Sequence, residues 1–314
     1  MKISSSVAYG MMGVAAIMWA TSGSLTVLAI DGGASAVQVS VFATVFTALI
    51  LLPLIYALDR KSIKIEKRDF WPFLAFSLVT GTFFAIAWYV CVDRVGVATA
   101  VILLYLYPSI VTIASIFLLG EKLTPQKMVA LPLTFIGCVL VAGAQDLGEG
   151  IPIDIIGIAL GLYTAFSGAV YYLWGKKFLD KYSANTVILY MTILSIPGLI
   201  LIANPANLGT DGITSGSWVY ILAIGFFPGT VGFVLSMAAL NHIEASKASI
   251  VASIEPVAAV LIAAAVLSDT LNRLQTVGVA LVFLGVILLR VSLRRRNGAK
   301  QATDKTRPDS LVLK

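Results

Sequence analysis

Long apolar stretches follow one another along almost the whole chain and constrain its fold more than any other feature. Ten of them, separated by short segments rich in charge, Gly, Pro or Asn, reach the length of about 20 residues that a helix needs to cross a bilayer. Because 59% of the 314 residues are hydrophobic and only 12% are charged, the composition does not fit a soluble domain. Runs such as 97–119 lack the alternation of transmembrane strands, so the sequence predicts an all-α membrane protein.

The ten expected transmembrane helices include one that begins close to the N-terminus. That first stretch follows Lys2 like a secretory signal, but at about 24 residues it is too long for one, and we expect a permanent span. The predicted spans cover 7–30, 36–58, 70–92, 96–119, 126–144, 152–174, 184–203, 217–240, 245–267 and 273–291.

Basic residues gather on one side of this predicted topology. Of the 22 Lys and Arg residues, 20 fall on the side of both termini, and only Arg94 and Arg273 fall on the other. Because basic loops are retained in the cytoplasm, we expect an inner-membrane protein with both termini cytoplasmic. The arginines at 294–296 directly follow the last span without interleaved aromatic residues, which indicates contact with the lipid bilayer rather than nucleic acid.

The chain also repeats itself at an offset of 148 residues. Pro108 then aligns with Pro256, Glu121 with Asp269, and the apolar segments around them match. The sequence therefore predicts two repeats of five helices, 1–148 and 149–293, followed by a basic, disordered cytoplasmic tail at 294–314. Because five is odd, the second repeat is inverted in the membrane, which is the architecture of many secondary transporters that work by alternating access.

Three segments carry a resemblance to a known family: Leu-Tyr-Leu-Tyr-Pro at 104–108, Leu-Gly-Glu-Lys-Leu-Thr at 119–124, and Glu255-Pro256. Together with the repeat and the topology, they resemble the EamA family of the drug/metabolite transporter superfamily over residues 7–291. The resemblance implies a ten-helix exporter or exchanger of small metabolites, often amino acids. It also implies a central cavity between the third, fourth, eighth and ninth helices and the first helix of each half. Residues 268–271, Ser-Asp-Thr-Leu, depart from the usual Gly-Glu-x-Leu but keep the acidic charge.

Glu255 is the acidic residue that the predicted topology places well inside a span. A charge at the bilayer centre costs about 2.5–3.5 kcal/mol on insertion scales, so this carboxyl group should face a cavity, meet a partner or carry a proton. It is a candidate for proton coupling or for binding a substrate amine. The alternative is structural, because Pro256 has no N–H and leaves the Ala252 carbonyl available to a protonated Glu255.

Pro108 and Pro256 occupy matching places in the two repeats, which favours hinges that let half-helices pivot during gating. Static kinks that improve helix packing are the alternative.

Aromatic and hydroxyl side chains form stripes at helical spacing on four of the predicted spans. Such stripes can stack on a flat or apolar solute while the hydroxyl groups orient its polar end. The alternative is an interfacial belt of Trp and Tyr, to which we assign Trp174 beside the lysines at 176–177. With Glu255, the predicted substrate-binding residues are Trp19, Phe84, Trp88, Tyr105, Ser109, Tyr163, Ser167 and Tyr171.

The sequence lacks the motifs that would indicate the enzyme classes considered for a membrane protein. One His and two Cys make neither a His-Glu-x-x-His motif nor a structural zinc site, and a phosphate-binding loop is absent. We therefore expect no metal, no cofactor and no enzymatic activity. The sequence predicts a monomeric secondary transporter of small metabolites, with amino acids or related aromatic or amphipathic solutes as substrates and protons as candidate coupling ions. An importer of sugars or nucleosides and a facilitative channel or uniporter remain alternatives.

Overall fold

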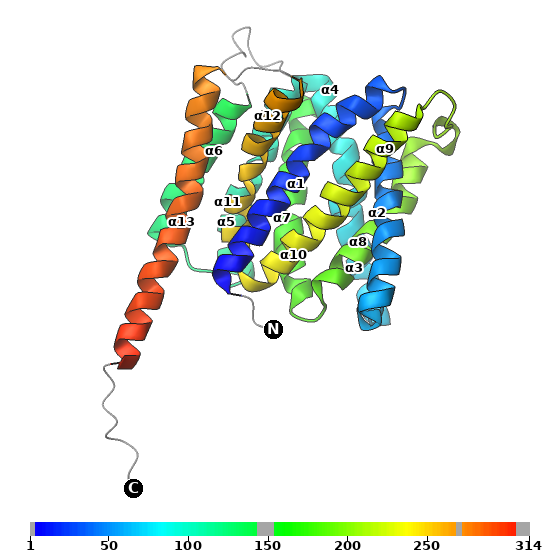
Figure 1. Cartoon of the computed structure of the whole chain (residues 1–314). Coiled ribbons are helices and arrows are strands. Elements are labelled where there is room, and N and C mark those ends of the chain that lie inside the picture. Colours follow the sequence, from blue (N-terminus) through cyan, green and yellow to red (C-terminus); the bar gives the residue numbers. More distant parts are fainter. Residues whose placement is uncertain (1–3, 143–153, 268–271, 306–314) are drawn as a thin grey trace.

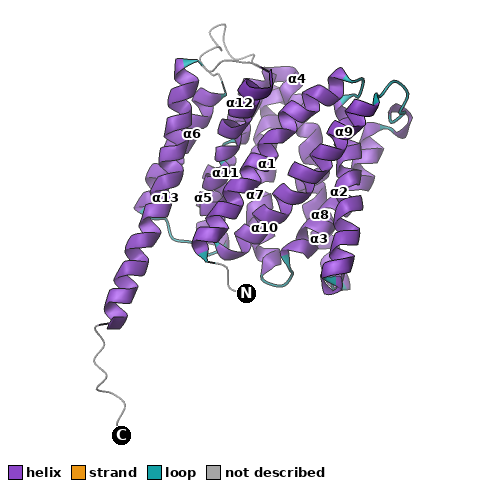
Figure 2. Cartoon of the chain, in the orientation of Figure 1, coloured by secondary structure: helices purple, strands orange, loops and turns teal. Residues whose placement is uncertain are grey.

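The computed structural model describes residues 4–142, 154–267 and 272–305, and this part of the chain is a bundle of helices without strands (Figure 2). The first half contains α1 (Ser5–Asp31), α2 (Ala36–Leu58), α3 (Phe70–Ser77), α4 (Phe83–Leu104), α5 (Tyr107–Leu118) and α6 (Pro125–Val141). The second half contains α7 (Ile155–Leu179), α8 (Ala184–Ala203), α9 (Ser215–Ile224), α10 (Phe233–His242), α11 (Ala245–Ala252), α12 (Ile254–Leu267) and α13 (Arg273–Lys305).

Shorter helical segments complete the bundle. The π-helical segments η3 (Leu78–Thr82) and η6 (Gly225–Gly232) join α3 to α4 and α9 to α10. Three 3₁₀ helices lie in loops: η1 (Arg60–Ile63), η2 (Lys67–Asp69) and η5 (Pro205–Asn207).

The predicted all-α membrane protein with ten transmembrane helices is confirmed. Within the described ranges, eight helical stretches are long and apolar enough to cross a membrane, and two shorter apolar helices, Pro125–Val141 and Arg273–Leu289, complete the set. The helix α1 begins at the end of the bundle where its repeat counterpart α7 ends (Figure 1), as two inverted repeats of five helices require.

The connection between the third and fourth spans is a single residue. The segment α4, from Phe83 to Leu104, consists of two helices that meet at a kink at Gly96, where φ is 78° and ψ is 161°. Glycine has no Cβ and adopts this left-handed conformation without strain. The loop that the sequence predicts at 93–95 is therefore reduced to this one sharp turn.

Helical interruptions occur at matching places in the two halves. The π-helical segment η3 lies 148 residues before positions 226–230, which are all inside η6. The gap between α4 and α5 begins at Tyr105, and the break between α11 and α12 lies 148 residues later, at Ser253. The repeat seen in the sequence is thus a repeat of backbone irregularities as well.

The two prolines predicted as hinges begin helices rather than bending them. Pro108 lies in the first turn of α5, and Pro256 lies in the first turn of α12, three residues after the break at Ser253. Proline is tolerated in the first turn because the N–H that it lacks has no intrahelical acceptor there. The discontinuities therefore precede the prolines by two to three residues.

One end of the bundle carries the start of α1 and the loops at 59–69, 119–124, 180–183 and 243–244 (Figure 1). Helix α1 begins and helix α13 ends on this side of the bundle, which agrees with an even number of spans. We call it the basic end, because 11 of the described Lys and Arg residues lie in or beside these loops: Arg60, Lys61, Lys64, Lys67, Arg68, Lys122, Lys127, Lys176, Lys177, Lys181 and Lys247.

The fifth span of the first half is α6, and that of the second half is α13. These two helices pack side by side at one flank of the bundle (Figure 1). Glycines make this close approach possible: a Cβ on Gly278 would lie 2.7 Å from the carbonyl oxygen of Gly137, and one on Gly285 would lie 3.0 Å from that of Ala130. Helix α13 continues to Lys305, so the first part of the tail predicted to be disordered from residue 294 is helical, while 306–314 lie outside the described residues.

The contact between α6 and α13 predicts the effect of one added methyl group. Gly278→Ala should destabilise the protein by about 1–3 kcal/mol, because backbone atoms of α6 cannot move aside for the new Cβ. Gly10→Ala is the matched control, since a Cβ there meets nothing within 4 Å. Thermal unfolding in detergent measures both variants, and equal melting temperatures for the two would contradict this description of the contact.

Candidate functional site

A cavity of about 260 Å³ lies near the middle of the spans. Its walls come from α1, α7 and the third, fourth, eighth and ninth spans, the set of helices that the family resemblance implies. The residues that line it are Trp19, Ser22, Thr80, Phe84, Leu104, Tyr107, Ser167, Gly168, Tyr171, Tyr172, Pro228, Phe233 and Glu255.

Aromatic rings in mutual contact form one side of the cavity. The Trp19 ring lies 5.4 Å from that of Phe233 and 6.2 Å from that of Tyr171, between ring centroids. Tyr171 meets Tyr172 edge-on at 5.2 Å, and Tyr172 stacks on Tyr107 at 5.5 Å. These distances are typical of favourable aromatic pairs, so the rings support one another as a rigid wall.

Close packing holds the Trp19 ring in place, and the N–H group of the indole is available for a hydrogen bond. A Cβ on Gly232 would lie 2.9 Å from Cδ1 and Nε1 of the indole, so the ring rests directly on the backbone of η6. Within the described part of the chain, the buried indole N–H has no hydrogen-bond acceptor. A buried donor without a partner is costly, which makes this N–H available to an acceptor group on a solute in the cavity.

Glu255 lies in the first turn of α12, with its side chain on the cavity wall. The hydroxyl group of Tyr105 interacts with its carboxyl group through a hydrogen bond. A helix N-terminus favours negative charge, because its first N–H groups lack intrahelical acceptors. The break before α12 therefore gives an acidic residue inside the membrane a suitable electrostatic environment.

Side chains from the first half supply hydrogen bonds at this break. The Tyr107 hydroxyl donates to the Ser249 carbonyl at 3.4 Å, and the Cys138 thiol donates to the Ser253 carbonyl at 3.8 Å. The amide of Ser253 bonds to Ile250, which leaves the Ser249 carbonyl without its usual partner in an α-helix. The carbonyls of Ser249 and Ser253 are therefore satisfied by side chains other than Glu255.

The π-helical segment η3 positions two of the predicted site residues. The carbonyl of Val79 accepts hydrogen bonds from the Ser167 hydroxyl at 2.9 Å and the Tyr163 hydroxyl at 3.2 Å. Ser167 reaches the cavity, whereas the Tyr163 ring packs against Phe166 and does not line it.

Five predicted residues meet at the cavity, and four lie elsewhere. Trp19, Phe84, Ser167, Tyr171 and Glu255 line it; Trp88, Tyr105, Ser109 and Tyr163 do not. Trp88 lies one turn beyond Phe84 and packs on a separate cluster with Cys91, Val95 and Ala100.

The break between α4 and α5 explains two of these differences. In a continuous helix Tyr105 and Ser109 share a face, but the turn at Tyr105 and Leu106 changes the helical phase. Tyr107 lines the cavity instead, whereas Tyr105 does not line it and interacts with Glu255.

The repeat offset identifies residues that helical spacing misses. Three pairs related by 148 residues line the cavity together: Trp19 with Ser167, Thr80 with Pro228, and Tyr107 with Glu255. Applying the offset to Glu255 would have found Tyr107 from the sequence. Ser22, Leu104, Tyr172 and Phe233 carry no comparable signal.

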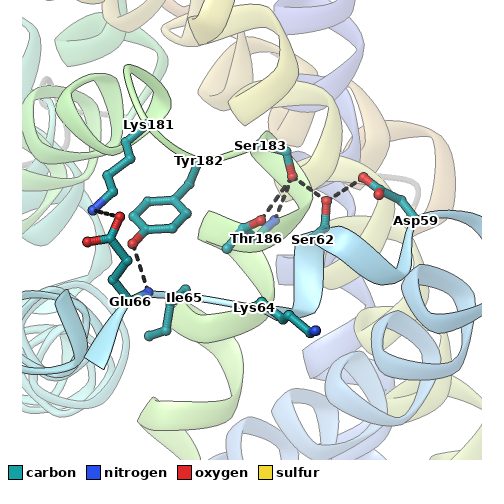
Figure 3. A pocket seen from close by; sticks show the side chains of 9 residues that line it. All are labelled: Asp59, Ser62, Lys64, Ile65, Glu66, Lys181, Tyr182, Ser183 and Thr186. Atoms are coloured by element: carbon teal, nitrogen blue, oxygen red, sulfur yellow. Dashed lines mark hydrogen bonds and ion pairs between the residues drawn. The ribbon is translucent and has the colours of Figure 1, made fainter. Parts of the chain in front are cut away.

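A second, more open pocket of about 560 Å³ lies at the basic end (Figure 3). Its polar groups are engaged with one another: Ser62 bonds to Asp59 and Ser183, and Lys181 pairs with Glu66 at 2.6 Å. Hydrogen bonds to Asp69 and Glu66 hold the pKa of Lys181 above its ordinary range, and Lys181 in turn lowers the pKa of Glu66. This pocket lies between the loop after α2 and the start of α8. Few of its polar groups are free to bind a solute.

The central cavity has groups that suit the binding of a small amphipathic solute. Its aromatic wall suits an apolar or flat group, the Glu255 carboxylate suits a cation or a hydrogen-bond donor, and the Trp19 N–H suits an acceptor. Among the described residues, no group of three or more His, Cys, Asp or Glu side chains could hold a metal ion.

Comparisons with known proteins agree with this arrangement. The EamA-like transporter family matches the chain twice, over residues 7–143 and 155–291, which are offset by 148 positions. An uncharacterized inner membrane transporter of Salmonella typhimurium, YicL, is 27% identical over 294 residues that cover 90% of this chain and 95% of the relative. An uncharacterized transporter of Archaeoglobus fulgidus is 30% identical over 67% of this chain and 74% of its own length.

Solved structures share the fold. A protein known from a crystal structure superposes with a TM-score of 0.81 over 93% of this chain and 99% of its own, at 16% sequence identity. Since the family matches both halves and nearly the full length of the spans, the chain belongs to the EamA-like transporter family and is a multi-pass membrane transporter rather than an enzyme.

Proposed function

We propose that this protein is a secondary carrier that moves small metabolites by alternating access between its two inverted repeats. The observation that carries the proposal is the position of the cavity, which lies where residue pairs related by the repeat meet and where both halves have interrupted helices. Broken helices at corresponding places in two inverted repeats are typical of transporter substrate sites.

The cavity supports amino acids or related aromatic solutes as the substrates. Its volume of about 260 Å³ is near the lower limit of ligand pockets, about 300 Å³, and suits a small metabolite. A substrate ammonium group would bind Glu255, a carboxylate would accept from Trp19, and an apolar side chain would lie on Tyr171 and Phe233.

The distribution of charge supports an orientation of the protein in the membrane, and one relative supports the membrane in which it lies. We propose that the basic end faces the cytoplasm, because 20 of the 22 basic residues lie on the side of both termini in the topology. The relative YicL is named an inner membrane transporter, and we propose the same membrane here, with export from the cytoplasm as the direction. One chain supplies the whole cavity wall, which supports a monomer as the functional unit.

Flux measurements in proteoliposomes test the proposal. A panel of labelled amino acids, sugars and nucleosides should reveal saturable uptake of amino acids and acceleration by the same solute on the opposite side. If only sugars or nucleosides showed saturable flux, they would be the substrates in place of amino acids. Flux that rises linearly with concentration and shows no trans-acceleration would indicate a channel and contradict the carrier.

Glu255 provides a prediction about coupling. Glu255→Gln removes the charge but keeps the shape of the side chain, so transport driven by a pH gradient should fall to the level of passive exchange. Glu66→Gln, at the basic end and outside the cavity, is the control. If the Glu255 variant retained full pH-driven transport, proton coupling through this residue would be wrong.

Trp19 provides a prediction about affinity. Trp19→Ala removes the indole that forms one wall of the cavity and should weaken solute binding about tenfold, equivalent to about 1.4 kcal/mol. Trp88→Ala serves as the matched control, because Trp88 packs outside the cavity. Equilibrium binding in detergent measures both, and equal affinities of the two variants would remove Trp19 from the site.

A further inference from the structure

Two segments that correspond in the repeat lie in different surroundings. Helix α11, Ala245–Ala252, has seven of its eight residues buried. At the offset of 148, its counterpart is the part of α4 at 97–104, in which only Thr99 and Ala100 are buried and Val97 is 61% exposed. The bundle is therefore packed tightly around α11 at the basic end and loosely around 97–104 at the opposite end.

The N-terminus of α11 is capped by a residue from the other half of the protein. Its own N-cap residue, Glu244, makes no side-chain capping bond. Glu121 takes this role: Oε1 accepts from the Ala245 amide at 2.6 Å, and Oε2 accepts from the Ser246 amide at 3.3 Å and from the Ser246 hydroxyl. A carboxylate at this place satisfies N–H groups that otherwise have no acceptor and complements the helix dipole.

A buried lysine completes this contact between the halves. The side chain of Lys127 is only 1% exposed, and its ammonium group lies 3.2 Å from Glu121 and 2.8 Å from Glu244. It also donates to the Lys122 carbonyl at 3.0 Å. Separating a buried ion pair without new partners is strongly unfavourable, so Glu121 and Lys127, which are 7% and 1% exposed, stay together while water is excluded, whereas Glu244 is 39% exposed and also pairs with Lys247.

A second lysine holds the other side of the same turn. Lys176, from α7, donates to the carbonyls of Leu240 at 2.6 Å and Ile243 at 2.9 Å, at the C-terminus of α10. The turn from α10 to α11 is thus bound by a cation at its carbonyls and by an anion at its amides, as the two helix ends require.

We propose that Glu121, Lys127 and Ser246 form a latch that holds the half-helix α11 as a closed gate at the basic end. This inference rests on the proposed carrier function. When the latch opens, water replaces the lost partners, α11 becomes accessible from the basic end, and its counterpart 97–104 becomes buried. Glu121 and Lys127 are positioning residues that touch the gate and lie away from the cavity.

Cysteine accessibility in the full-length protein tests the latch without any solute. The native cysteines, both buried, are first replaced as Cys91→Ala and Cys138→Ser, the latter to keep a donor to Ser253. Single reporters are then introduced as Ala252→Cys, fully buried in α11, and Leu104→Cys, its counterpart on the cavity wall. Oriented vesicles are treated with a membrane-impermeant maleimide from each side in turn.

Glu121→Gln should increase the labelling rate at Ala252→Cys from the basic end about tenfold and decrease that at Leu104→Cys from the opposite end. Glu66→Gln, which lies in an ion pair at the same end but not on α11, should change neither rate. Ser246→Ala removes one donor to Glu121 and should act in the same direction with a smaller effect. If gel filtration shows that Glu121→Gln does not fold, the Ser246→Ala variant is used for the test instead.

Faster labelling at Ala252→Cys with no decrease at Leu104→Cys would mean that α11 frays locally, and it would overturn the gate. Unchanged rates at both reporters in a folded protein would overturn the latch as well. Because labelling needs no transport, an opened gate in a protein with no saturable flux would refute the carrier function alone. Saturable flux with unchanged labelling would refute the latch alone.

Discussion

The need to satisfy every backbone hydrogen bond inside a membrane governs this structure. Lipid supplies no partners, so a spanning helix can be interrupted only where neighbouring groups replace the lost bonds. Here they come from across the bundle: Tyr107 bonds to the Ser249 carbonyl, Ser167 to that of Val79, and Thr47 to that of Gly225. Two of these donors, Tyr107 and Ser167, also line the cavity, so two of the interruptions lie beside it.

The two halves share irregularities but differ in packing. The π-helical segments and the breaks at Tyr105 and Ser253 follow the repeat, so both halves can adopt the same set of shapes. Yet α11 is buried and its counterpart 97–104 is largely exposed. Such a difference in packing between two halves of the same design is expected of the alternating-access carrier proposed above when it is closed at one end. The contacts of Glu121 with α11 give a physical reason for which end is closed.

The sequence could predict whatever depends on hydropathy and on the repeat. The spans, their number and the offset of 148 follow from long apolar runs, and Glu255 stands out because a charge in a span is costly. Side-chain directions near the breaks could not be predicted, because helical spacing assumes a continuous helix. Tyr105 and Ser109 were expected on the cavity wall for this reason, whereas Tyr107 occupies it. Glu121 stood out in the repeat and in a family motif, but its role could not be predicted, since its partner Ser246 is 125 residues away.

The central claim is that the two ends of the bundle open in turn. Distances between spin labels measure this directly, with one pair at Lys122 and Asn241 at the basic end and another at Asp31 and Val97 at the opposite end. Addition of a transported solute should change the two distance distributions in opposite directions, one lengthening as the other shortens. Two distributions that stay unchanged, or that lengthen together, would contradict alternating access in this protein.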